Sequence, residues 1–223
     1  MSPNQNKSQH KNYEIIGFDL DGVLLDSVRN GHNEWMHRVL KKTLDYFGIP
    51  STKQNMEKIR MDNLMKNIRT VCRDWGIEPE VLWQVREKNL QTEKCKAIKT
   101  SEITLFPDVK IVGTLSQNYT LVICSNVTQE LLNFLMEYFS LDKYFSYWIG
   151  RNGDIKDLMR MKPNPYFLNK MILQLHSMNI LYIGDREQDR IAAHRAGIDF
   201  LLLSRNGNNG DLQNLYELVA YLQ

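Results

Sequence analysis

Residues 15–22 read IIGFDLDG, an apolar run that ends in two aspartates and a glycine. The run is strand-sized and continuous rather than alternating, which suits a strand buried on both faces of a parallel sheet. Similar runs follow at residues 121–124, 147–149, 180–183 and 200–203. Helical patterns lie between the runs, near residues 109–116, 129–139, 165–175 and 188–196. Strand and helix in alternation predict a doubly wound α/β core with a parallel, Rossmann-like sheet.

The stretch after the first run has a different pattern. Amphipathic helical patterns occupy residues 32–47, 62–75 and 79–96, with no convincing strand among them. We therefore expect three parts: a disordered polar tail at residues 1–12, an α/β core at residues 13–27 and 104–223, and a helical cap domain at residues 28–103. A helical insertion at the carboxyl edge of a sheet is a candidate lid over a site there.

Composition narrows the classes of function. A net charge of +2, with Lys and Arg scattered along the chain, does not favour nucleic acid, which a clustered basic stripe would. No apolar stretch approaches the length of a membrane span, and the polar first residues do not resemble a secretory signal. The three cysteines lack the spacing of a zinc site or a disulfide framework, so the expected location is cytoplasmic. The expected state is a monomer or homodimer.

Polar residues with catalytic potential follow several of the predicted strands. Ligands of open α/β sheets bind beyond the carboxyl ends of the strands, so these residues are expected to share one crevice. They are Asp19 and Asp21 after the first run, Ser125 and Asn126 after the second, Asp185 and Asp189 after the fourth, and Lys162 before a helix.

This set has a chemical reason to exist. Carboxylates crowded together raise one another's pKa unless a cation lies among them, and oxygen ligands suit Mg²⁺. One aspartate can then attack phosphorus, while a second exchanges protons with the leaving oxygen and with water. Serine, asparagine and lysine can supply donors to the charge on the transferred group.

Four stretches in this order resemble the haloacid dehalogenase-like superfamily, in its helical-cap subgroup that includes phosphoglycolate phosphatase and β-phosphoglucomutase. The matching stretches are FDLDGVLLDS at residues 18–27, ICSN at 123–126, KPNP at 162–165 and IGDREQD at 183–189. Together they span the predicted core. The resemblance implies a Mg²⁺-dependent phosphoric monoester hydrolase whose partner is a small phosphorylated metabolite. Asp21 favours phosphoryl transfer over dehalogenation, because dehalogenases of this superfamily do not need this second acid.

The resemblance also implies a role for each matched residue. Asp19 would be the nucleophile that becomes an aspartyl-phosphate, and Asp21 the general acid and base. The metal would be held by Asp19, Asp185 and the backbone carbonyl of Asp21, with Asp189 supporting them from behind. Phosphoryl oxygens would be bound by Ser125, Asn126 and Lys162, and Lys162 would also neutralise Asp19.

One departure and three alternatives remain open. Arg186 stands where Ser or Thr is commoner in the family, and we expect it to point away from the site or to pair with a nearby acid. A sugar phosphomutase of the β-phosphoglucomutase type would use the same site with a second phosphate pocket. A phosphonatase would need a cap lysine that forms a Schiff base. A catalytically silent binding or regulatory protein on this fold would have lost turnover, although no motif residue is missing.

Overall fold

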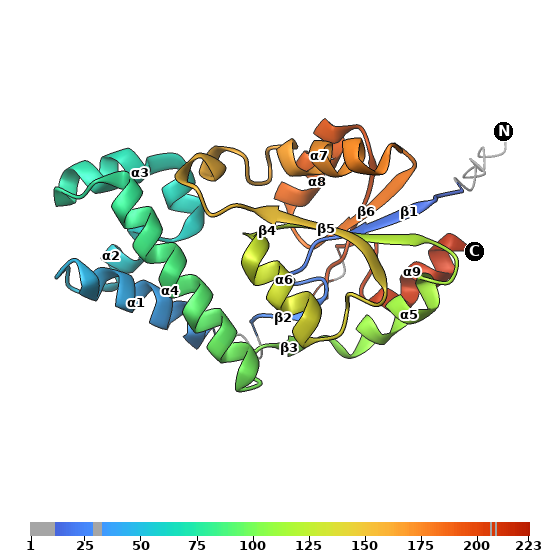
Figure 1. Cartoon of the computed structure of the whole chain (residues 1–223), viewed down its shortest axis with the longest axis horizontal. Coiled ribbons are helices and arrows are strands. Elements are labelled where there is room, and N and C mark those ends of the chain that lie inside the picture. Colours follow the sequence, from blue (N-terminus) through green and yellow to red (C-terminus); the bar gives the residue numbers. More distant parts are fainter. Residues whose placement is uncertain (1–11, 29–32, 206, 208) are drawn as a thin grey trace, which may run out of the picture.

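The structure, a computed structural model, describes residues 12–28, 33–205, 207 and 209–223. The predicted disordered tail at residues 1–12 lies outside the described residues, except for Asn12. A parallel sheet flanked by helices forms one end of the molecule, and a group of four helices forms the other (Figure 1).

Five parallel strands make up the main sheet, as the apolar runs predict. In spatial order they are β5 (Phe145–Arg151), β4 (Thr120–Thr128), β1 (Ile15–Phe18), β6 (Ile180–Gly184) and β7 (Asp199–Leu202). β1 lies in the middle and is buried along its whole length, because it has a strand on either side. The residues that follow β1 therefore emerge at the middle of the sheet's carboxyl edge.

Helices cover both faces of this sheet (Figure 1). The first face carries α7 (Tyr166–Leu175) and α8 (Glu187–Ala196), and the second carries α5 (Val112–Leu115), α6 (Gln129–Tyr138) and α9 (Leu215–Leu222). Val122 and Tyr182 are buried with the first group, while Phe18 and Ile123 are buried with the second. Apolar residues on both sides of each strand explain the continuous runs, and the predicted doubly wound α/β class is confirmed.

Two short 3-10 turns complete this part: η2 (Pro107–Ile111) and η3 (Ile155–Met159). The helix expected over residues 109–116 is therefore divided between η2 and α5.

Four helices follow the first strand along the chain: α1 (Glu34–Tyr46), α2 (Lys53–Lys58), α3 (Met61–Trp75) and α4 (Pro79–Lys99). They lie beyond the end of the sheet toward which β1 runs (Figure 1). Leu44, Leu64 and Trp83 belong to a buried cluster that is centred on these helices. The patterns at residues 32–47, 62–75 and 79–96 thus predicted α1, α3 and α4, while the short α2 was not predicted.

A two-stranded antiparallel ribbon joins the two ends of this helical segment. It pairs β2 (Leu25–Asp26) with β3 (Thr104–Leu105). The predicted boundaries between core and cap fall beside this ribbon, although the division into two domains stays a prediction. No helix among the described residues combines the length and apolarity that crossing a bilayer requires.

Candidate active site

Three neighbouring strands, β4, β1 and β6, carry predicted site residues at or near the carboxyl edge of the sheet. Phe18 of β1 is in register with Ile123 of β4 and with Ile183 of β6. Asp19 follows Phe18 directly, while Ser125 and Asp185 come two residues after Ile123 and Ile183. Strand register therefore brings these three predicted site residues to one place.

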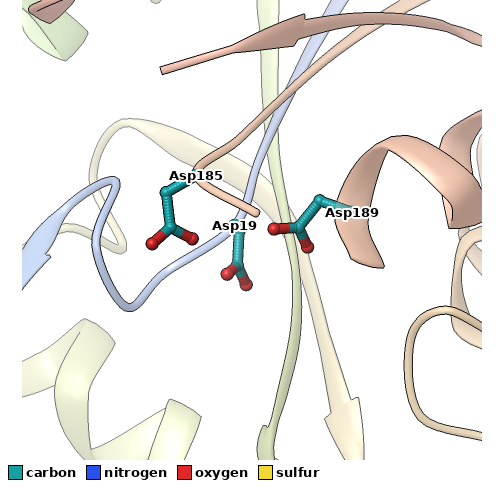
Figure 2. Close-up of side chains that lie close together, drawn as sticks. All are labelled: Asp19, Asp185 and Asp189. Atoms are coloured by element: carbon teal, nitrogen blue, oxygen red, sulfur yellow. The ribbon is translucent and has the colours of Figure 1, made fainter. Parts of the chain in front are cut away.

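The carboxylates of Asp19, Asp185 and Asp189 face one another at this edge (Figure 2). One oxygen atom of each lies within 4.8 Å of the corresponding oxygen of the other two. Burial, followed by the charge of Asp19, raises the pKa of Asp185 to about 7. Burial also raises the pKa of Asp19, against the opposing charge of Lys162. Like charges held this close favour either a bound proton or a bound cation.

The donor set at this edge fits a hard divalent cation. Asp185 Oδ1 is buried and has no hydrogen-bond donor among the described residues. Asp19 Oδ1 is also buried, and its ion-pair partner is Lys162 Nζ at 2.9 Å. The carboxylates of Asp185 and Asp19 are oxygen ligands of the kind that Mg²⁺ accepts, together with water and phosphate oxygens.

Lys162 supplies the positive charge at the back of this group. Its ammonium lies 2.9 Å from Asp19 Oδ1 and 2.5 Å from Asp189 Oδ1, and it donates a hydrogen bond of 2.8 Å to the Tyr182 hydroxyl. Burial alone would lower the pKa of Lys162, but the two acids outweigh burial and raise it well above its usual value. Lys162 is therefore a permanent cation that neutralises part of the acidic cluster.

Asn126 fixes the segment that carries Lys162. Its Oδ1 accepts from the Lys162 backbone N–H at 3.0 Å, and its Nδ2 donates to the Lys162 carbonyl at 3.4 Å. Ser125 beside it is buried and lines a pocket at this edge of the sheet, together with Asn126 and Lys162. The direct contact of Asn126 with Lys162 was not anticipated from the sequence, and phosphoryl binding by Ser125 and Asn126 stays a prediction.

Asp189 lies at the start of α8, where each of its carboxylate oxygens contacts a different residue. Its Oδ1 pairs with Lys162, while its Oδ2 accepts from the Arg186 backbone N–H at 3.1 Å. The second contact satisfies a free donor at the helix N-terminus. Arg186 exposes most of its side chain, and its Nε lies 3.7 Å from Asp185 Oδ2, so it pairs with a nearby acid as expected.

Asp21 lies two residues after Asp19 and is held separately from the three-carboxylate group. Both of its oxygens accept from Lys94 Nζ at 2.6 Å, and Oδ1 also accepts from the Ser27 hydroxyl. Burial would raise the pKa of Asp21, but the charge of Lys94 and these hydrogen bonds hold it below its usual value. In this structure, Asp21 is therefore ionised and restrained from α4.

Gly22 makes the turn after Asp21 possible. Its φ is +81°, and a Cβ at this position would overlap the carboxylate of Asp185. Glycine accepts both the left-handed conformation and the close approach, so the turn can bring Asp21 and Asp185 to the same site.

A pocket of about 220 Å³ connects this edge of the sheet with the helical segment. At the sheet edge it is lined by Asp19, Asp21, Ser125, Asn126, Lys162 and Asp189, with Arg151 at the end of β5. On the side of the helical segment it is lined by the apolar residues Met61, Met65 and Leu90 and by the cations Arg60, Arg86 and Lys94. The site is therefore closed partly by residues that the motif analysis did not select.

Two signals in the sequence point to the cations that were missed. Leu82, Arg86, Leu90 and Lys94 recur every four residues and are all buried, so charged residues occupy an apolar stripe of α4. Arg151 ends β5, and following this strand to its carboxyl end, as was done for the others, would have found it.

Fold and site together define a hydrolase with a doubly wound α/β core. Its candidate reactive aspartates follow the first strand and face a mostly helical insertion. Residues 16–203 match the family model described as Haloacid dehalogenase-like hydrolase. The chain therefore belongs to the haloacid dehalogenase-like hydrolase family. The enzyme class expected from the sequence, a phosphoric monoester hydrolase, is confirmed at this level.

Individual relatives agree with this assignment. A phosphoglycolate phosphatase of Aliivibrio fischeri is 29% identical over 212 residues, which cover 89% of this chain and 87% of the relative. A phosphoglycolate phosphatase of Aquifex aeolicus is 27% identical over 187 residues, which cover 82% and 81% of the two chains. A crystal structure described as a predicted phosphoglycolate phosphatase from Haemophilus somnus superposes with a TM-score of 0.68 at 21% identity, covering 95% of this chain and 99% of the other. The last likeness supports the fold alone.

Proposed function

We propose that this phosphatase is Mg²⁺-dependent and hydrolyses a small phosphomonoester through an aspartyl-phosphate on Asp19. The observation that carries the proposal is the group formed by Asp19, Asp185 and Asp189, with Lys162 bound to two of its members. A carboxylate in such a group can attack phosphorus only if its neighbours' charge is neutralised. Mg²⁺ held by Asp19, Asp185 and the Asp21 carbonyl would supply that neutralisation and orient the phosphoryl oxygens.

The proposed reaction has two displacements at phosphorus. In the first, an oxygen of Asp19 bonds to phosphorus and the bond to the leaving oxygen breaks, while Asp21 gives its proton to that oxygen. In the second, water attacks phosphorus, Asp21 takes a proton from the water, and the bond between Asp19 and phosphorus breaks. Phosphate leaves, and both aspartates return to their starting state.

In this proposal, Lys94 favours one of the two proton transfers of Asp21 over the other. Because Lys94 favours the ionised form of Asp21, the arrangement suits the second displacement, in which Asp21 accepts a proton. The first displacement needs a protonated Asp21, so the contact with Lys94 has to be weakened when the leaving group enters. Lys162 and Ser125 would meanwhile bind the transferred phosphoryl oxygens.

The domain division forms part of the same proposal. Residues 13–27 and 104–223 would be the core, and residues 28–103 would be a cap that sets specificity. The buried cluster centred on α1–α4 and the pocket between these helices and the sheet edge support this division. A cytoplasmic location and a monomeric or homodimeric state remain predictions.

A sugar phosphomutase is the second candidate, and one observation favours it. Several cations line the pocket on the side of the helical segment, where a second phosphate would lie. A mutase would interconvert phosphorylated isomers without net release of phosphate, so product analysis separates the two activities. The phosphonatase alternative gains less support, because Lys94, which lines the pocket from α4, is engaged in an ion pair with Asp21.

The test is a phosphate-release assay over a panel of phosphorylated metabolites, with Mg²⁺ and with a chelator. Phosphoglycolate belongs in the panel because the relatives carry its name. Asp19→Asn should abolish Mg²⁺-dependent release, whereas the same substitution at the exposed Asp142 should leave it intact. Release that persists in Asp19→Asn would reject this mechanism, and full binding without any turnover would favour the silent binding protein.

A further inference from the structure

Two buried arginines in the pocket wall share a single acid. Arg86 on α4 and Arg151 at the end of β5 each have side chains that are only 1% exposed. Arg86 Nη1 lies 3.2 Å from Glu87 Oε1, and Arg151 Nη2 pairs with Glu87 Oε2. Within the part of the chain that the structure describes, Glu87 is the only carboxylate in ion-pairing distance of either guanidinium.

The group formed by Arg86, Arg151 and Glu87 holds two positive charges and one negative charge, so one positive charge is not neutralised. Lys94, the next cation of the same wall, is matched by Asp21 and contributes no spare charge. Burial and the charge of Arg151 hold the pKa of Arg86 below its usual value despite the presence of Glu87. A buried charge without a partner is costly, and removing its counter-ion costs more than an ordinary contact contributes.

The guanidinium groups also retain hydrogen-bonding capacity. Arg151 Nε donates to the Asn126 carbonyl at 2.6 Å, and Arg86 Nε donates to the Ile59 carbonyl at 2.9 Å. Arg151 Nη1 is buried and has no hydrogen-bond partner among the described residues. Unpaired buried donors are rare in proteins, and at the wall of a ligand pocket they indicate a ligand acceptor.

We propose that Arg151 and Arg86 form a subsite for a second anionic group of the substrate, a carboxylate or a phosphate, beside the phosphoryl group that is hydrolysed. The inference rests on the proposed function, because the same pocket holds both groups. Planar guanidinium groups suit either anion, since both offer paired oxygens.

The position of Arg151 limits the distance between the two groups. Its hydrogen bond to the Asn126 carbonyl ties it to the residue beside Ser125 and to the segment that carries Lys162. With a pocket of about 220 Å³, the second anion has to lie within a few bonds of the phosphoryl group. The preferred substrate is therefore a small diacid rather than a long-chain or neutral ester.

Three esters of one two-carbon frame test this proposal. They are phosphoglycolate, which ends in a carboxylate, ethylene glycol bisphosphate, which ends in a phosphate, and 2-hydroxyethyl phosphate, which ends in a neutral hydroxyl. We expect kcat/KM for at least one acidic ester to exceed that for the neutral ester by about tenfold or more, as charge-assisted hydrogen bonds provide. The acidic ester with the higher kcat/KM shows whether the subsite prefers a carboxylate or a phosphate. Equal kcat/KM values for all three would overturn the proposal.

Two variants with opposite expected effects on substrate preference distinguish loss of the subsite from loss of folding. Arg151→Met should lower the ratio of acidic to neutral kcat/KM by about tenfold. Glu87→Gln keeps both guanidinium groups and removes their acid, so it should raise that ratio. Arg38→Met removes an ion-paired arginine that does not line the pocket, and the ratio should stay as in the wild type. An Arg151→Met protein that keeps the wild-type ratio would contradict the assignment.

Binding to Asp19→Asn separates this proposal from the proposed function. Calorimetric titration of that variant with the same three esters should give tighter binding of an acidic ester, and Arg151→Met in that background should remove the difference. If the wild type releases phosphate from none of these esters and from no member of the metabolite panel, but this binding difference is present, the phosphatase mechanism fails and the subsite stands. If phosphate is released but the binding difference is missing, the subsite fails alone.

Discussion

At the scale of single residues, the contact between Lys94 and Asp21 connects α4 with the proposed acid and base. Lys94 Nζ lies 2.6 Å from both oxygens of Asp21 and is itself almost fully buried. Its charge and hydrogen bonds lower the pKa of Asp21, whereas burial acts in the opposite direction. The acid form that the first displacement needs is therefore scarce as long as Lys94 is in place.

Replacement of Lys94 by methionine should shift the pH dependence of the reaction. Without the ammonium, burial raises the pKa of Asp21, so the acid form persists to higher pH. We expect the alkaline limb of kcat/KM to move to higher pH, measured by phosphate release across the pH range. Lys88→Met, on the same helix but without a contact to Asp21, is the control. An unchanged alkaline limb in Lys94→Met would show that Asp21 is not the group that titrates there.

Asp185 predicts how metal binding changes with pH. Its pKa in the metal-free protein is about 7, above the usual value of 3.8, so between these values the folded protein binds a proton that the unfolded chain does not. This group therefore stabilises the metal-free fold less as the pH rises from 4 to 7. Mg²⁺ needs the ionised carboxylate, so it has to displace that proton at low pH.

The increase in Tm caused by Mg²⁺ should therefore be larger at pH 8 than at pH 5.5. Differential scanning calorimetry with Mg²⁺ and with a chelator measures it. Asp185→Asn should show a smaller increase that depends less on pH. An equal increase at both pH values in the wild type would mean that Asp185 does not bind the ion.

At the scale of elements, the turn after β1 is held from a distant loop. Arg205, which follows β7, donates to the carbonyls of Gly22 and Val23 at 3.1 and 2.6 Å and pairs with Asp108 at 2.9 Å. These contacts fix the segment that carries Asp21. Asp108 thus contributes to a link between η2 and the site.

Arg205→Met should reduce turnover through this link. The carbonyls of Gly22 and Val23 would lose their donor and Asp108 its counter-ion, so we expect a loss of stability of about 1–3 kcal/mol. The turn would be less ordered, and kcat should fall more than KM rises. Urea unfolding and steady-state kinetics measure the two effects. Full kcat in a destabilised variant would show that the link is structural only.

Gly22→Ala tests the turn itself. A residue with a Cβ would be strained by about 1–3 kcal/mol at a φ of +81°. It would also push against Asp185, so the variant should lose Mg²⁺-dependent stabilisation as well as stability. Gly48→Ala is the matched control, because its φ is also positive but no atom lies near its missing Cβ. If both variants respond to Mg²⁺ equally, Gly22 has no special relation to the metal site.

The elements also show what the sequence pattern could and could not provide. Continuous apolar runs predicted β1, β4, β5, β6 and β7, because strands covered on both faces need apolar residues at every position. The short α2 and the β2–β3 ribbon were missed, since six and two residues are too few to form a periodic pattern. The terminal α9 was not selected, although its apolar residues are buried with the sheet.

At the scale of the whole molecule, the pocket depends on contacts between segments far apart in the chain. Motif reasoning identified the residues at the strand ends, because parallel strands bring their carboxyl ends to one edge. It missed Arg86 and Lys94, since their positions depend on how α4 lies against the sheet edge. Their place in an apolar stripe of α4 marks them as unusual in the sequence, but only the folded structure shows that they line the pocket.

The whole account depends on Asp19 accepting the phosphoryl group, and rapid acid quenching tests this most directly. Protein mixed with Mg²⁺ and a hydrolysed ester is quenched during turnover, and the peptide that contains Asp19 is analysed by mass spectrometry. We expect a phosphoryl group on Asp19 that disappears in a chase without ester and never forms in Asp19→Asn. Rapid turnover with the phosphoryl group on another residue, or with none on the protein, would contradict the account.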